Sequence, residues 1–448
     1  LEQEKYNEAL MYLDEVMEWY RDHVAYDDPS APRIISLVGD VYLKQTNYIK
    51  AKELYQESIE AIYPGSGYRL SSHLRRKLGL LHQYQWQYEE AKSIYTEILK
   101  QSKQEYGEDH HETFDALLNL GNLYKAHSLY EEAGTLLLQA SDGYRRKYTA
   151  MDPDTLRAIN ALGSLLQEQQ KYDDAERLFA EVLETSRSGF GADHPSTLKA
   201  QWWLASLFAA QDQYHKASTY YAKAIAGYRE FFGDEHPDTL QIITQMGRLL
   251  AEQGSHGEAE EQFADVIASS TSQFGPTHRI TLTAIITMGG FLVNQDRLDE
   301  AEKLYRTTLE LCRGELGDEG LQTLGMIVKL ADLLEKTGKY ESAEQLYREQ
   351  LEAYERVYGK EHAFTLRVSL EKATRLRDQE KFPEAEALYK KNYETYLSLY
   401  GPDNSQTLAA LWWLGIFYDI QGNVKEAENF YDSTIEGYRR LYGEENSE

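Results

Sequence analysis

A threonine recurs every 42 residues along this chain, and that interval restricts the fold more than any other feature. The spacing is kept without a slip through eight copies: Thr113, Thr155, Thr197, Thr239, Thr281, Thr323, Thr365 and Thr407. A fixed period of this size is typical of solenoids, in which each repeated unit packs only on its neighbours. The period therefore predicts a surface for holding another protein, and it says little about which protein.

Other positions repeat together with the threonine. A glycine or alanine stands eight residues after it, an alanine twenty after it and a bulky residue twenty-four after it, as in Gly247, Ala259 and Phe263 of the unit at Thr239. The step of four residues from alanine to bulky residue is one turn on one face of a helix. A small residue at position eight lets a second helix approach closely. Each unit is therefore predicted to be two antiparallel helices, A and then B.

The junctions between units have a pattern of their own. A glycine stands six residues before most of the threonines, usually after an aromatic residue, as in Phe232-Gly233. Glycine just beyond a helix end supplies a left-handed cap, and a proline such as Pro237 fits the first turn of the next helix. The junction at Tyr148-Thr149 lacks the glycine.

The repeat extends toward the N-terminus and defines the domain organisation. Ser71 keeps the interval, and an earlier unit with Gly39 and Ala51 follows at a spacing of 40, which makes ten helix pairs. Residues 1–24 are predicted to be an unpaired B-type helix, and residues 25–448 one continuous solenoid. Because the chain starts halfway through a unit and ends at a junction, we expect a piece of a longer protein whose apolar ends associate end to end or fray.

The repeated positions resemble the tetratricopeptide repeat over nearly the whole chain. The 42-residue length and the junction Phe232-Gly233-Asp234-Glu235-His236-Pro237-Asp238-Thr239-Leu240 are similar to the kinesin light chain type. The same long repeat ends many STAND signalling NTPases of fungi and bacteria. The resemblance implies an all-α, right-handed superhelical solenoid whose concave side holds an extended peptide or a helix of a partner.

Composition restricts the partners and the compartment. With 47 basic and 74 acidic residues the formal net charge is −27, which argues against nucleic acid and anionic membranes as main partners. The charge favours a basic or hydrophobic partner, although a solvated acidic exterior explains it as well. The single Cys312 excludes an internal disulfide framework and suits a reducing, cytoplasmic compartment. Neither a transmembrane run nor a signal peptide is visible.

The sequence carries no recognisable catalytic, cofactor or metal motif. It lacks nucleotide-binding glycine loops, the paired histidines of zinc proteases and the C-x-x-C pattern. Five histidines recur three residues before the threonine: His110, His194, His236, His278 and His362. Five copies at one junction are better explained by hydrogen bonds in the loop than by five active sites.

Function is expected on the face of helix A that does not pack on helix B. Positions two, five, six, nine and thirteen after the threonine point away from the packed stripe. The groove candidates at or beside these positions are Trp202, Trp203, Trp412, Trp413, Asn119, Asn122, Asn160 and Arg157. A tryptophan is a common interface anchor, but one of each pair could instead fill the gap between neighbouring A helices.

A basic cluster interrupts the acidic chain in the unit at Ser71. It consists of Arg69, Arg75, Arg76 and Lys77. The cluster is either a site for an acidic stretch of a partner or a solvated turn.

The sequence therefore predicts a non-catalytic protein-binding scaffold, the recognition or regulatory arm of a larger protein. One alternative is a cargo adaptor of the kinesin light chain type. Another is an enzyme with its active site in the superhelix groove.

Overall fold

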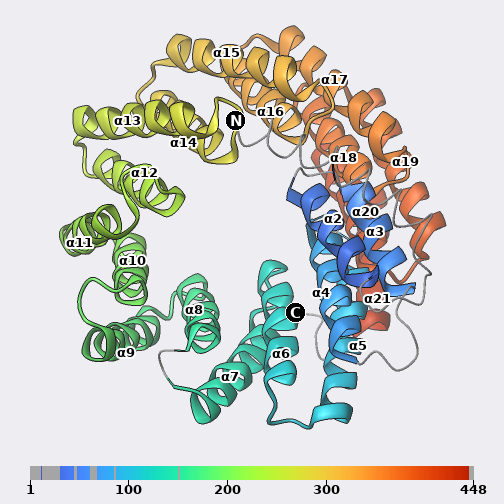
Figure 1. Ribbon diagram of the computed structural model, residues 1–448. Helices are drawn as coiled ribbons and strands as arrows, with labels where there is room; N and C mark the ends of the chain where they lie inside the picture. Colours follow the sequence, from blue (N-terminus) through green and yellow to red (C-terminus); the bar gives the residue numbers. More distant parts are fainter. Residues whose placement is uncertain are drawn as a thin grey trace. The chain divides into compact units, whose positions relative to one another are not determined.

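The computed structural model describes Tyr12 and residues 31–44, 48–60, 68–84, 87–149 and 152–442. All regular secondary structure in this part of the chain is α-helical, which confirms the predicted all-α repeat fold (Figure 1). The predicted opening helix, residues 1–24, lies outside the described residues except for Tyr12.

Even-numbered helices are the A helices of the units, and odd-numbered helices are the B helices. Their bounds are α2 (Ala31–Lys44), α3 (Tyr48–Glu60), α4 (Tyr68–Tyr84), α5 (Tyr88–Tyr106), α6 (His111–Ala126), α7 (Tyr130–Lys147), α8 (Pro153–Glu168), α9 (Tyr172–Phe190), α10 (Pro195–Ala210), α11 (Tyr214–Phe232), α12 (Pro237–Glu252), α13 (His256–Phe274), α14 (Arg279–Asn294), α15 (Leu298–Leu316), α16 (Leu321–Lys336), α17 (Tyr340–Tyr358), α18 (Ala363–Asp378), α19 (Phe382–Tyr400), α20 (Ser405–Ile420) and α21 (Val424–Tyr442).

The chain divides into two compact units, Leu1–Leu311 and Cys312–Glu448, here called unit 1 and unit 2. In unit 1 every helix from α2 to α13 packs on the next helix along the chain. Neighbouring A helices also touch one another, as α6 does α8 and α12 does α14. In unit 2 each helix from α16 to α20 likewise packs on its successor. One continuous solenoid over residues 25–448 stays a prediction.

The small residue at position eight admits the aromatic ring at position twenty-four. A Cβ atom added to Gly247 would lie 2.7 Å from Cε1 of Phe263, and one added to Gly163 would lie 2.4 Å from Cε1 of Phe179. Real Cβ atoms do not approach carbon so closely, so only glycine allows this contact without a shift. The predicted close approach of helices A and B is confirmed at these positions.

The recurring threonine holds the junction through its side chain. Thr239 is fully buried, and its hydroxyl donates to the carbonyl oxygen of Gly233 at 3.0 Å. The same bond recurs in five further repeats: Thr113 to Gly107, Thr197 to Gly191, Thr281 to Gly275, Thr323 to Gly317 and Thr365 to Gly359. The hydroxyl of Thr407 donates to the carbonyl oxygen of Tyr396 at 3.1 Å. The threonine thus fixes the end of one B helix to the start of the next A helix.

The recurring histidine caps the A helix that follows it. Nδ1 of His236 accepts from the backbone N–H of Asp238 at 3.2 Å, and the His236 ring stacks on Phe232 at 4.5 Å. His110, His194, His278 and His362 cap their helices in the same way. An N-cap acceptor satisfies a backbone donor that has no partner inside the helix. The structural interpretation of these histidines is confirmed.

The junction at Tyr148-Thr149, which lacks the glycine, caps the next A helix with a different residue. Asp152 replaces the histidine and accepts from the backbone N–H groups of Asp154 and Thr155. At this junction the carbonyl oxygen of Thr149 accepts from the backbone N–H of Asp152, and the buried hydroxyl of Thr155 has no hydrogen-bond partner among the described residues.

This difference gives a matched pair of substitutions. Thr239→Val keeps the shape of the side chain but removes the donor to Gly233, so we expect a loss of about 1–2 kcal/mol in unfolding free energy. Thr155→Val removes a hydroxyl that has no partner and should be neutral or stabilising. Urea unfolding of both variants beside the wild type measures the difference. Equal losses at the two positions would contradict this role of the hydroxyl.

Candidate functional site

Three adjoining cavities lie along the A helices of unit 1. They have volumes of about 430, 240 and 140 Å³ and are lined from α8, α10, α12 and α14, with one residue each from α11 and α13. Arg248 of α12 lines all three, Glu252 lines two of them, and Gln245 lines two. We call this surface the A-helix groove. It lies on the helices and the face where the sequence predicts binding.

Arg248 stands at position nine after Thr239 and is exposed. Its guanidinium makes no ion pair or hydrogen bond to any residue that the structure describes. A guanidinium offers five donors in a planar fork that matches a carboxylate or two carbonyl oxygens. The groove therefore contains a cation that is available to a ligand.

Beside Arg248, two side chains donate hydrogen bonds to Gln245. Oε1 of Gln245 accepts from Nε1 of Trp202 at 2.6 Å and from the hydroxyl of Tyr221 at 3.1 Å. Burial raises the pKa of Tyr221 to about 12, so the phenol stays protonated and donates at neutral pH. These bonds join α10, α11 and α12 and fix the ring of Trp202. The side-chain N–H₂ of Gln245 has no acceptor within the described chain and is left for a ligand.

The largest of the three cavities combines an apolar floor with polar edges. Phe263 and Phe291 are buried beneath it, and Ile286 of α14 is half-buried at its side. Gly290 leaves open space where a side chain would otherwise project. An apolar floor with a few polar groups is the usual make-up of a binding pocket.

The tryptophans predicted from sequence lie in two separate units. Trp202 and Trp203 belong to α10 of unit 1, and both are half-buried. Both pack against the core of unit 1; the ring of Trp203 lies 5.6 Å from that of Phe179 in the preceding repeat, and Trp202 donates to Gln245, which lines the A-helix groove. In unit 2 Trp412 is 49% exposed, and Trp413 packs on the core of α18, α19 and α20.

The predicted asparagines are partly exposed on α6 and α8. Asn119, Asn122 and Asn160 make no hydrogen bond to any other described residue. Amide side chains in this state can bond a peptide backbone through both their oxygen and their nitrogen. They lie on α6 and on α8, the first helix that contributes to the groove.

Most of the basic cluster is bonded to neighbouring helices. Arg76 pairs with Asp115 at 2.7 Å and with Glu112 at 3.4 Å, and Lys77 pairs with Asp40 at 2.6 Å. Arg75 donates to Oε1 of Gln101 at 3.1 Å. The side chain of Arg69 lies outside the described residues.

Asp115 is the centre of a charged network that joins α4, α6 and α8. Its carboxylate accepts from Arg76, from Arg157 and, at 2.8 Å, from the hydroxyl of Tyr144. Burial and the neighbouring carboxylate raise the pKa of Tyr144, so this phenol remains a donor. Arg157, a groove candidate, also pairs with Asp154 at 3.1 Å. Its charge is thus used inside the protein.

The same network contains a possible metal-ligand set of one histidine and two carboxylates. Ligand atoms of His111, Asp115 and Asp154 lie within 4.8 Å of one another. His111 already bonds Asp154 at 2.9 Å, and Asp115 is shared by two guanidiniums and a phenol. Guanidiniums at this distance oppose a further cation, so the geometry favours an ion-pair network over a metal site.

Replacing Asp115 tests the network. Asp115→Asn removes the buried carboxylate that Arg76 and Arg157 share, so we expect a loss of about 2 kcal/mol or more in unfolding free energy. Asp109→Asn is the control, because Asp109 is 64% exposed and its ion pair with Arg146 should contribute about 0–1 kcal/mol. Thermal and urea unfolding compare the two variants, and similar losses would show that Asp115 is an ordinary surface charge.

Comparison with known families decides the class of the protein. A tetratricopeptide repeat profile matches residues 69–146, 154–230, 196–272, 322–391 and 369–440, and a second profile with the same description matches 281–320. The chain belongs to the tetratricopeptide repeat family. Arrays of this family are typically non-catalytic protein-interaction scaffolds, and neither matching profile describes an enzyme. Among the described helices, none is both long and apolar enough to cross a lipid bilayer.

Solved tetratricopeptide structures align with the chain at low identity. The TPR-like repeats attributed to a kinesin light chain of Podospora anserina are 21% identical, with 46% of this chain and 99% of that one covered and a TM-score of 0.40. A Rap protein complexed with competence and sporulation factor is 14% identical, with 79% and 94% covered and a TM-score of 0.47. The quorum sensor NprR from B. thuringiensis is also 14% identical, with 78% and 97% covered and a TM-score of 0.47. At these scores the likenesses carry no argument about function. Comparison with curated proteins finds no match.

Arg248 and Gln245 were not among the residues predicted from the sequence. Both stand at positions that the repeat assigns to the free face of helix A, nine and six after Thr239. A systematic survey of position nine would have found Arg248, the arginine that stands at this position in the described units. What the sequence could not show is that this arginine is left without a carboxylate partner.

Proposed function

We propose that this chain is a non-catalytic scaffold that binds an extended peptide of a partner protein along the A-helix groove. The observation that carries the proposal is Arg248, an exposed guanidinium without a partner in the described chain, which lines all three cavities. A charge-assisted bond from arginine to a peptide carboxylate is among the strong interactions at interfaces. The free amide of Gln245 suits a backbone carbonyl, and Glu252 suits a donor of the peptide.

The apolar part of the groove gives the peptide its second anchor. An aliphatic or aromatic side chain fits the cavity over Phe263 and Phe291, beside Ile286. Burial of apolar area contributes about 25 cal/mol per Å² before the entropy cost of binding. The proposed partner segment therefore combines a hydrophobic residue with a carboxylate or a free C-terminus.

The other predicted contacts extend this proposal. Asn119, Asn122 and Asn160 would bond the backbone of a longer peptide on α6 and α8, and Trp412 offers a separate contact in unit 2. The basic cluster remains a proposed site for an acidic stretch. Because Arg76 and Lys77 already have carboxylate partners, it would act mainly on association rate and salt dependence.

We further propose a cytoplasmic role as the recognition or regulatory arm of a larger protein. A STAND-type signalling protein and a kinesin light chain-type cargo adaptor both fit this role. End-to-end self-association is also proposed, since α21 exposes Val424, Ile435 and Leu441. Contiguous exposed apolar side chains promote association.

Substitutions in the groove test the proposal on an array of peptides with varied acidic and apolar residues. Arg248→Ala should weaken the peptides that the wild type binds by about tenfold, because it removes the charged anchor. Trp202→Ala should weaken the binding of these peptides by a similar factor, because it removes the hydrogen bond that holds Gln245. Arg187→Ala is the control, since Arg187 is an exposed arginine of α9 that lines none of these cavities. Affinities that fall equally for the control, or for neither groove variant, would exclude the A-helix groove as the site.

A further inference from the structure

At two junctions an ion pair joins the B helices of neighbouring repeats, and the junction at Gly134 lacks it. A glutamate directly after the repeated alanine bonds to a cation 37 residues later: Glu260 to Arg297 at 2.6 Å in unit 1, and Glu344 to Lys381 at 2.7 Å in unit 2. At the same positions of the units at Thr113 and Thr155 the residues are Gly134 and Lys171. The carboxylate is missing there, while the cation remains.

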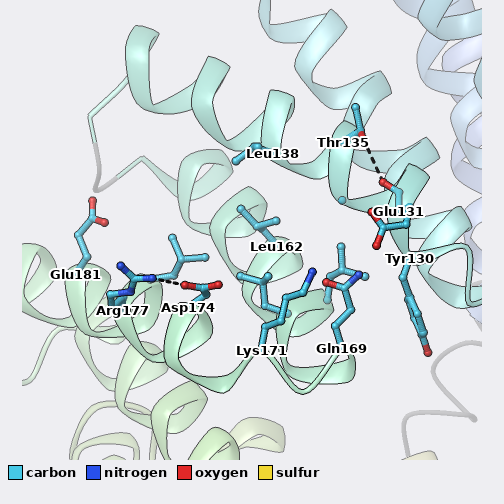
Figure 2. Close-up of a pocket in the computed structure, with 14 residues that line it drawn as sticks. Tyr130, Glu131, Thr135, Leu138, Leu162, Gln169, Lys171, Asp174, Arg177 and Glu181 are labelled. Carbon is cyan, nitrogen blue, oxygen red and sulfur yellow. Dashed lines mark hydrogen bonds and ion pairs between the residues drawn. The ribbon is translucent and has the colours of Figure 1, made fainter.

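The ammonium group of Lys171 is exposed and makes no ion pair or hydrogen bond within the described chain. Figure 2 shows its side chain in the space between α7 and α9. Since the corresponding cations bind glutamate at two other junctions, Lys171 stands at a position where this repeat accepts a carboxylate.

The missing glutamate side chain also opens a pocket. A cavity of about 620 Å³ lies between α7, α8 and α9 (Figure 2). Leu162, Leu165 and Leu178 form its apolar floor, and Leu138 of α7 is 50% exposed at its edge. The volume is within the range of about 300–1,000 Å³ that ligand pockets occupy. The pocket involves both B helices of the junction and is distinct from the A-helix groove.

The other charges around this pocket restrict the ligand. Arg177 pairs with Asp174, and Glu181 pairs with Arg145 at 3.3 Å. Glu131 stands on the α7 side, where its carboxylate has no ion-pair partner in the part of the chain that is described. It would repel a second negative charge. The pocket therefore suits one carboxylate beside an apolar group, and a polyacidic stretch would fit poorly.

We propose that this pocket binds a segment of a partner protein in which an apolar side chain stands next to an aspartate or glutamate. The carboxylate pairs with Lys171 in place of the glutamate absent at position 134, and the apolar side chain covers the leucines. A polypeptide is the matching occupant because two other junctions place a glutamate side chain of the protein itself against the corresponding cation. The surface is a second one, and the proposal does not depend on peptide binding in the A-helix groove.

Gly134→Glu restores the missing residue and tests the proposal directly. A Cβ atom at this position would lie 3.6 Å from Cδ2 of Leu165, which is ordinary contact, and replacing a helical glycine favours the helix. The variant should therefore keep the fold and the melting temperature while it fills the pocket and neutralises Lys171. Gly257→Glu is the control: it adds the same charge at an exposed glycine of α13 that has open space around it.

The probe is a displayed library of random linear peptides, selected on the wild-type chain alone. We expect the enriched peptides to share an acidic residue next to an aliphatic or aromatic one. Their binding should fall by about tenfold or more in Gly134→Glu and in Lys171→Ala, and it should persist in Gly257→Glu. It should also persist in Arg248→Ala, which separates this site from the A-helix groove.

Three results would overturn the proposal. Peptides that bind Gly134→Glu as well as the wild type would show that the pocket is not used. Enriched peptides without an acidic residue, or no enrichment above an empty matrix, would remove the role of Lys171. Self-association of the wild type that disappears in Gly134→Glu would assign the pocket to a second copy of this chain.

Discussion

The repeat depends on the close contact between the backbone of an A helix and a bulky side chain, usually aromatic, of its B helix. Where glycine stands at position eight, as in Gly247 against Phe263, no larger residue fits without a shift. The buried bond from Thr239 to Gly233 then sets where the next unit starts. Because each unit contacts mainly its neighbours, these two local interactions, repeated along the chain, hold the array in register.

These contacts leave out the face of helix A that does not pack on helix B, so residues on that free face can vary. Its residues carry none of the repeated contacts, so they can differ from unit to unit without loss of the fold. In some units they bond to neighbouring helices, as Arg76 does to Asp115. Around Arg248 they do not, and the cavities there combine a free cation, a free amide and an apolar floor. Binding is therefore proposed at two places where the chain departs from the repeat, around Arg248 and at Gly134.

The repeated features were predictable because they are local in sequence. The helix pairs follow from the spacing of threonine, glycine, alanine and aromatic residue, and the capping role of His236 follows from its recurrence. The ion pairs between neighbouring repeats were not predictable in the same way. Arg76 and Lys77 form a basic cluster in sequence, but their carboxylate partners lie 39 and 37 residues away. The free state of Arg248 depends on the same long-range geometry, so sequence patterns alone could not separate it from the paired arginines.

The most direct test of the central claim is the nuclear magnetic resonance signal of the groove side chains. The claim is that the free face of the A helices in unit 1 binds the partner. On addition of a peptide that the wild type binds on the array, the indole N–H of Trp202 and the guanidinium N–H of Arg248 should shift, because Trp202 donates to Gln245, which lines the groove, and Arg248 is the charged anchor. If the peptide binds while both signals stay where they are, the partner is bound elsewhere and the account of the A-helix groove is wrong.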